Sequence, residues 1–266
     1  MSEPFVITSA SNAEVKAVRA LQSKKGRAEQ QAFLSEGLRH VLEAVRQGWA
    51  VRRLFLAKGT RRGELLDQAI AACEASGGRV VTVSDELMTR IAKRGNAQSV
   101  LAVIEQRWAR LADVQAEETA LWIGLDRVRD PGNLGSVLRS ADAFAASGII
   151  LIGDCVDPFS VESVRASMGA IVSVPLIRCS EEAFLDWRQS WSGDVVGTHL
   201  SGELPPPDGA SLPTLLLMGN EQAGLSDALT SACESRVRIP MRDGADSLNL
   251  AAASAILLHA LTRGRF

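Results

Sequence analysis

The segment Leu215-Leu-Leu-Met-Gly-Asn-Glu-Gln-Ala-Gly-Leu225 runs from an unbroken apolar stretch into a loop that contains two glycines. Consecutive apolar residues predict a strand buried on both faces, which is typical of a parallel sheet covered by helices. Gly219 and Gly224 suit tight turns and the close approach of a ligand to the backbone. Glu221, the one carboxylate of the loop, would repel a polyphosphate. The loop therefore favours a ligand with a cationic portion.

The same alternation of strands and helices extends over the C-terminal half. Six apolar segments predict strands, at 121–125, 149–153, 172–177, 194–198, 214–218 and 236–239. Five other segments predict helices, at 134–146, 161–168, 181–190, 226–233 and 248–262. We expect an α/β domain over residues 120–266, with a parallel sheet that binds its ligand at the carboxyl ends of the strands.

The N-terminal half predicts a smaller α/β sandwich over residues 1–112. Residues 11–48 have apolar side chains at helical spacing, interrupted by a basic turn at 23–27. Strands are expected at 51–56, 79–83 and 100–104, and helices at 64–76 and 85–90. The polar stretch that starts at Asp113 predicts a linker over residues 113–119.

The two halves differ in charge. Residues 1–113 hold 18 Lys and Arg against 12 Asp and Glu, whereas the remainder holds 11 against 19. A basic half beside an acidic half is expected of a module that grips RNA next to a small-molecule enzyme. Chance asymmetry of solvated surface is the alternative. The residues we expect to contact phosphates are Lys24, Lys25, Arg27, Arg39, Arg52, Arg53, Arg61, Arg62, Arg90, Lys93 and Arg94.

Composition excludes several classes of site and protein. The chain has no Tyr, which excludes a site that needs a phenol. Its four cysteines form no C-x-x-C pair, so neither a metal cluster nor a disulfide framework is expected. The N-terminus lacks the pattern of a signal peptide, and the longest apolar stretch is too short to span a bilayer. We expect a soluble cytoplasmic protein.

Two further loops follow predicted strands. In the first, Pro131-Gly132 turns the chain and Asn133 is expected to be the N-cap of the next helix. Arg139 lies further along that helix, where its side chain leans back toward Asn133. In the second, Ser247 and Asn249 lead into a helix of small residues; a plain helix cap is the alternative reading of both.

Together and in this order, the three loops resemble the signature motifs of the SpoU/TrmH family of RNA ribose 2′-O-methyltransferases. The corresponding residues are Asn133-x-Gly135-x-x-x-Arg139-x-Ala141, Leu217-x-Gly219-x-Glu221-x-x-Gly224-Leu225, and Ile239-Pro-Met241 through Ser247-Leu248-Asn249. Residues 28–105 also resemble the substrate-binding domain of many members, which has the fold of a small RNA-binding ribosomal protein.

The resemblance implies the SPOUT fold, in which the C-terminal segment forms a deep trefoil knot, and a homodimer. It implies S-adenosylmethionine (SAM) as methyl donor and no metal. The residues implied to contact SAM are Met218, Gly219, Asn220, Gly224, Ile239, Met241, Leu248 and Asn249.

The implied reaction is the attack of a ribose 2′-hydroxyl on the methyl group of SAM. Such a hydroxyl is a poor nucleophile near neutral pH and must be activated or oriented. No motif supplies a His or Lys base. We hypothesise that Arg139 activates the hydroxyl with help from the substrate phosphate, mainly by orienting the hydroxyl and stabilising charge. The other residues with implied catalytic roles are Asn133, Glu221, Ser247 and Asn249.

The two-domain organisation favours ribosomal RNA over transfer RNA as the substrate. A tRNA 2′-O-methyltransferase and an RNA-binding protein without catalytic activity are the alternatives. A nucleotide-dependent oxidoreductase would need G-x-G-x-x-G, which Gly132-Asn-Leu-Gly135 does not supply.

Overall fold

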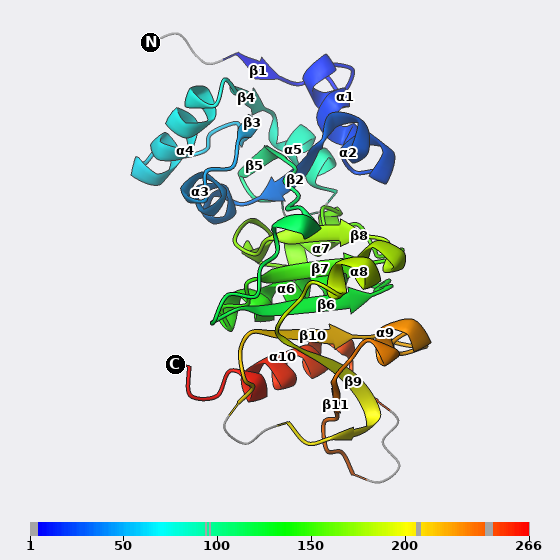
Figure 1. Ribbon diagram of the computed structural model, residues 1–266. Coiled ribbons are helices and arrows are strands. Elements are labelled where there is room, and N and C mark those ends of the chain that lie inside the picture. Colours follow the sequence, from blue (N-terminus) through cyan, green and yellow to red (C-terminus); the bar gives the residue numbers. More distant parts are fainter. Residues whose placement is uncertain (1–4, 94, 96, 206–208, 243–246, 266) are drawn as a thin grey trace. The chain divides into compact units, whose positions relative to one another are not determined.

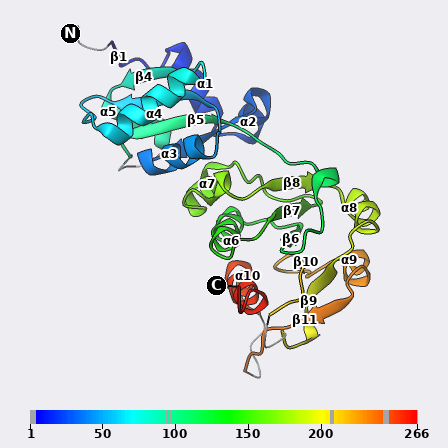
Figure 2. The same ribbon diagram turned by 60° about the vertical axis from the view of Figure 1, so that its left-hand side comes forward.

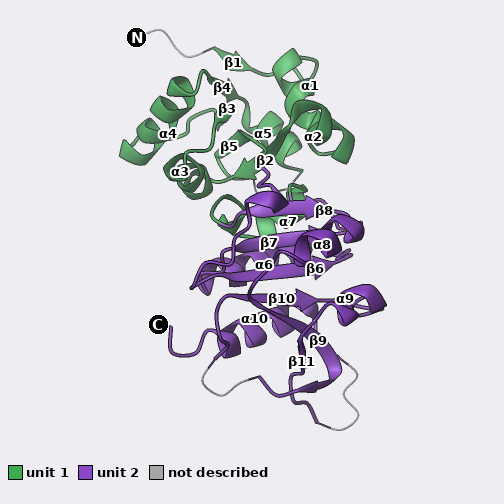
Figure 3. Cartoon of the chain, in the orientation of Figure 1, with its two compact units in different colours: residues 1–106, 159–173 green, residues 107–158, 174–266 purple. Residues whose placement is uncertain are grey.

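The computed structural model describes residues 5–93, 95, 97–205, 209–242 and 247–265. The chain forms two compact units, coloured separately in Figure 3. The first comprises residues 1–106 and 159–173, and the second comprises residues 107–158 and 174–266. The chain therefore leaves the second unit once, contributes residues 159–173 to the first, and returns.

The first unit is built on a mixed sheet in the order β1-β4-β3-β5-β2 (Figure 1). Its strands are β1 (Val6–Ile7), β2 (Ala32–Glu36), β3 (Val51–Ala57), β4 (Arg79–Val83) and β5 (Val100–Glu105). Strands β1, β4 and β3 are parallel, whereas β5 is antiparallel to both of its neighbours.

Helices pack on this sheet and complete the core of the first unit. They are α1 (Ala13–Ala20), α2 (Lys24–Gln30), α3 (Leu38–Arg46), α4 (Glu64–Ala75), α5 (Asp85–Ala92) and α7 (Val161–Ala166). Val18 of α1 and Met88 of α5 are buried in one cluster with Phe55 and Leu101 of the sheet. The predicted α/β character of this half is confirmed.

Two expectations for the N-terminal residues are wrong. The basic stretch at 23–27 is no turn: the Ser23 side chain accepts from the Gly26 N–H and caps α2. Arg27 is buried and donates to the carbonyl of Leu21. Residues 32–36 form β2 rather than helix, because they pair with β5, whose residues lie about seventy positions further along the chain.

Residues 159–173 are held in the first unit by aromatic contacts. The rings of Phe33 and Phe159 lie 4.9 Å apart, centroid to centroid. Trp49 Nε1 donates to the carbonyl of Val172 over 3.0 Å. Phe33 and Phe159 are fully buried, so this segment completes the core of the first unit.

The second unit contains a six-stranded parallel sheet in the order β11-β9-β10-β6-β7-β8. Its strands are β6 (Leu121–Asp126), β7 (Gly148–Ile152), β8 (Leu176–Cys179), β9 (Asp194–Glu203), β10 (Thr214–Met218) and β11 (Ser235–Val237). Helices α6 (Pro131–Ala143) and α10 (Leu250–Leu261) cover one face, and α8 (Glu181–Arg188) and α9 (Asp227–Ser231) cover the other (Figure 2). The predicted parallel α/β sheet is confirmed.

The strand expected at 172–177 is misplaced. Residues 170–172 form a short 3-10 helix, and β8 starts only after Pro175. Proline has no N–H to donate to a neighbouring strand, which explains why regular pairing begins beyond it. None of the described helices combines the length and apolar character needed to cross a bilayer.

The domain limits stay a prediction. Residues 107–119, which include the predicted linker, belong to the second unit, where Val114 is buried in the core. The trefoil knot likewise stays a prediction.

Candidate active site

Loop two, residues 219–226, follows β10 and is folded tightly on itself. A Cβ placed on Gly219 would lie 2.1 Å from both the carbonyl carbon of Gly224 and the nitrogen of Leu225. The main chains of Asn220 and Gly224 exchange two hydrogen bonds, of 3.1 and 2.9 Å. Only glycine therefore fits at position 219, because the backbone of the same loop fills the space that a side chain would take.

A chain of hydrogen bonds connects this loop to the other two motif loops. Asn133 Nδ2 donates to Glu221 Oε1 over 3.0 Å, and Asn249 Nδ2 donates to Asn133 Oδ1 over 2.7 Å. The three residues are separated by 88 and 116 positions in sequence. The fold thus brings three of the five predicted catalytic residues together at the carboxyl end of the sheet.

Asn133 does not have the expected role of N-cap. Helix α6 begins two residues earlier, at Pro131, and the side chain of Asp130 caps it by accepting from the Asn133 N–H over 2.6 Å. Because Asp130 is the cap, the amide side chain of Asn133 is available for Glu221 and Asn249.

Asn249 does cap its helix. Its Oδ1 accepts from the N–H groups of Ala251 and Ala252, and its Nδ2 remains for Asn133. One side chain therefore fixes the start of α10 and joins it to α6.

We expect Asn249→Ala to lower the free energy of unfolding by about 1 kcal/mol, as is usual for loss of an N-cap. Asn249→Asp keeps the cap but replaces the donor to Asn133 with a carboxylate. We therefore expect Asn249→Asp to be as stable as the wild type, whereas both variants should lose methyl transfer. Urea unfolding and a methylation assay on both variants measure the two effects. Full activity of Asn249→Asp would contradict a role for the link to Asn133.

Arg139 stands apart from this chain of contacts. It lies on α6 six residues beyond Asn133, about 9 Å along the helix axis. Its side chain is exposed, and no hydrogen bond or ion pair joins it to the described parts of the chain. Its guanidinium is therefore available to a substrate.

The remaining predicted residues differ in accessibility. Met218 is buried in β10, whereas Ser247 and Leu248 are exposed. Ile239 and Met241 are half-buried beyond β11, two strands away from β10. No hydrogen bond between described residues joins either of these two to loop two.

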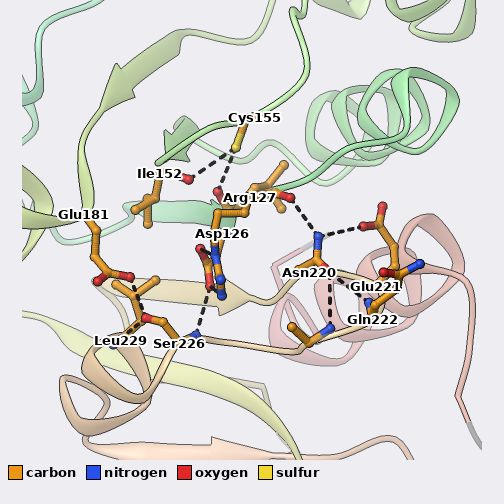
Figure 4. A network of polar contacts seen from close by, with 12 residues as sticks. Asp126, Arg127, Ile152, Cys155, Glu181, Asn220, Glu221, Gln222, Ser226 and Leu229 are labelled. Atoms are coloured by element: carbon orange, nitrogen blue, oxygen red, sulfur yellow. Dashed lines mark hydrogen bonds and ion pairs between the residues drawn. The ribbon is translucent and has the colours of Figure 1, made fainter.

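Sequence reasoning missed a second polar network, around Asp126 at the end of β6 (Figure 4). Asp126 pairs with Arg127 and reaches Ser226, whose hydroxyl donates to Glu181 over 2.6 Å. The bond to Asp126 raises the pKa of Arg127. The signal in the sequence was an acidic residue that ends a continuous apolar strand.

Burial disfavours the thiolate form of the cysteines near the sheet. Burial raises the pKa of Cys155, and it raises the pKa values of Cys179 and Cys233 to about 11. At pH 8 these thiols stay protonated, and thiols react as thiolates.

We therefore expect Cys179 and Cys233 to react with a disulfide reagent at pH 8 about a hundredfold more slowly in the folded chain than in urea. Mass spectrometry of timed samples resolves each site. Equal rates in both states would contradict the protected environment.

The chain matches known protein families over both of its halves. Residues 120–259 match the SpoU rRNA Methylase family. This chain belongs to that family. Residues 12–102 of this SpoU family member match the MRM3-like substrate binding domain.

Several relatives of this SpoU family member are characterised or solved. It is 36% identical to the 23S rRNA (uridine(2479)-2′-O)-methyltransferase of Streptomyces viridochromogenes, over 88% of this chain and 83% of the relative. It is 29% identical to the 23S rRNA (guanosine(2553)-2′-O)-methyltransferase RlmP of Bacillus subtilis, over 96% and 98%. The crystal structure of an AdoMet-bound rRNA methyltransferase from Sinorhizobium meliloti superposes with a TM-score of 0.90, at 42% identity and 97% coverage of both chains. The predicted family and the predicted class of enzyme, a methyltransferase, are confirmed.

Proposed function

We propose that this chain transfers the methyl group of SAM to a ribose 2′-hydroxyl of ribosomal RNA. The observation that carries the proposal is the chain of hydrogen bonds Asn249–Asn133–Glu221, which joins the three motif segments at the carboxyl end of the sheet. The relatives named above support the reaction and the class of RNA.

Loop two fits SAM by its charge. Gly219 lets the loop fold tightly on itself, and Glu221 is an exposed carboxylate of the same loop. When bound, SAM supplies a methyl group made electrophilic by its sulfonium. The residues that would hold it are Met218 through its main chain, Gly219, Asn220, Gly224, Ile239, Met241, Leu248 and Asn249.

The protein side of the reaction is orientation and charge stabilisation. Arg139 is proposed to hold the ribose hydroxyl and the neighbouring phosphate, because a guanidinium donates in two directions and matches phosphate oxygens. The oxygen–carbon bond forms as the sulfur–carbon bond breaks, and the hydroxyl proton leaves to solvent. The hydrogen bond between Asn133 and Glu221 holds the start of α6 against loop two, and Ser247 is proposed to contact the substrate. The proposed reaction uses no metal.

The first unit is proposed to grip RNA, with a smaller set of residues than the sequence suggested. Arg27 is buried, and Arg52 and Arg53 pair with Glu105 and Glu14. Lys24, Arg39, Arg61 and Lys93 are exposed and remain the best candidates for phosphate contact. Arg94 lies outside the described residues. We also infer that the protein is a cytoplasmic homodimer with a knotted C-terminal domain.

The test is incubation with methyl-labelled SAM and separately purified ribosomal and transfer RNA, followed by mapping of the 2′-O-methyl position. Label in ribosomal RNA alone is the expected result. Label in transfer RNA would favour the alternative substrate, and an absence of SAM binding would favour a binding protein.

A further inference from the structure

Asp126 closes β6 with a carboxylate that is almost completely buried. Its side chain is 1% exposed and accepts three hydrogen bonds. Two come from Arg127, from Nε over 2.7 Å and from Nη2 over 2.8 Å. The third comes from the Ser226 N–H over 2.9 Å, across one hundred positions of sequence. A carboxylate this buried is stable only because donors surround it.

Arg127 uses its main chain as well as its side chain. It adopts φ 50°, in the left-handed region that L-residues rarely enter. In this conformation its carbonyl accepts from Asn220 Nδ2 over 2.8 Å. Residues held in such a conformation are found where a particular geometry is needed.

Loop two is therefore attached at both ends to the end of β6 (Figure 4). Asn220 is held by the carbonyl of Arg127, and its Oδ1 in turn accepts from the N–H groups of Gln222 and Ala223. Ser226 is held by Asp126. One ion pair fixes both attachments, because the same two residues provide both acceptors.

We propose that Asp126 and Arg127 are positioning residues that fix loop two in the shape that binds SAM. This inference rests on the proposed function. Among the described residues, the pair makes no hydrogen bond to Arg139 or Ser247, which are proposed to contact the acceptor, so it acts on the methyl donor rather than on the acceptor hydroxyl. Loss of the pair should raise the Kd and the KM for SAM and leave kcat at saturating SAM nearly unchanged.

A buried ion pair that only stabilised the fold would have no such selectivity. Ile177→Ala provides the comparison, since Ile177 is buried on β8, two strands away from β6. Asp126→Asn provides a milder change, because it removes the charge but keeps an oxygen that accepts from Ser226.

The experiment measures SAM affinity by calorimetry, steady-state methyl transfer, and hydrogen exchange of the loop amides. For Asp126→Ala we expect the Kd for SAM to rise about 10- to 100-fold, the equivalent of one charge-assisted hydrogen bond. We expect kcat to change by less than about threefold. The amides of Gln222, Ala223 and Ser226 should exchange about tenfold faster.

Asp126→Asn should show the same pattern at smaller size, and it decides the matter if Asp126→Ala does not fold. Ile177→Ala should lower the melting temperature without changing the Kd. An unchanged Kd in a folded Asp126 variant, or an equal rise in Ile177→Ala, would overturn the proposal. A wild-type chain that binds no SAM would refute the proposed function, whereas faster exchange of the loop amides in the Asp126 variants would still support positioning of the loop.

Discussion

Arg139→Ala is expected to lower kcat for RNA methylation by about a thousandfold while the Kd for SAM stays the same. The expected size is that of removing a preorganised charge from a reaction centre. The physical reason is that Arg139 is exposed and makes no hydrogen bond to the described residues, including those of loop two. Its loss should therefore affect the acceptor and leave the methyl-donor site intact.

Two variants make this test specific. Arg139→Lys keeps the charge but loses the planar fork, so partial activity is expected. Arg110→Ala removes an exposed arginine that forms an ion pair with Asp113, three residues further along, and should leave kcat unchanged. Kinetics at saturating SAM together with calorimetry measure the effect. Turnover of Arg139→Ala near the wild-type rate would remove Arg139 from the mechanism.

Arg165→Ala is expected to destabilise the first unit by about 2–4 kcal/mol, the range for removing one partner of a half-buried ion pair. Arg165 Nη2 lies 3.0 Å from Glu36 Oε2 and also donates to the carbonyl of Ala92. The Glu36 side chain is 9% exposed, and apart from Arg165 it accepts from the Gln98 N–H. Without Arg165 this carboxylate would be left in a nearly dry site.

The matched control is Arg62→Ala. Arg62 pairs with Asp67 over 2.8 Å, but both side chains are more than half exposed, so the change should cost less than about 1 kcal/mol. Urea unfolding followed by circular dichroism, with hydrogen exchange of β2, measures both variants. Equal destabilisation by the two substitutions would show that the Glu36–Arg165 pair does not hold α7 in the first unit.

Local pattern was sufficient for the bounds of two strands. Strand β10 has the predicted bounds, because a continuous apolar run between turn residues has few other stable conformations. Strand β4 also has the predicted bounds, although its burial alternates along the strand. Strand β2 was predicted as helix, since it lies between apolar residues at helical spacing, such as Leu21 before it and Leu38 after it. Its conformation is decided by pairing with β5, a contact that no local window contains.

The candidate site divides in the same way. The sequence motifs were sufficient to identify Asn133, Glu221 and Asn249 as site residues and to predict the family. The hydrogen bonds among them were not, because they join residues 88 and 116 positions apart. The predicted N-cap role of Asn133 was also wrong, because Asp130, three residues earlier, caps α6 instead.

The sequence by itself determined the parallel α/β class, the glycine-rich loop after Met218 and the residues of the three motifs. These follow from short-range preferences of apolar runs, glycines and caps. The tertiary structure alone decided that residues 159–173 fold with the first unit and that Asp126 and Arg127 hold both ends of loop two. Those features depend on burial and on donors supplied by distant segments, which exist only once the chain has folded.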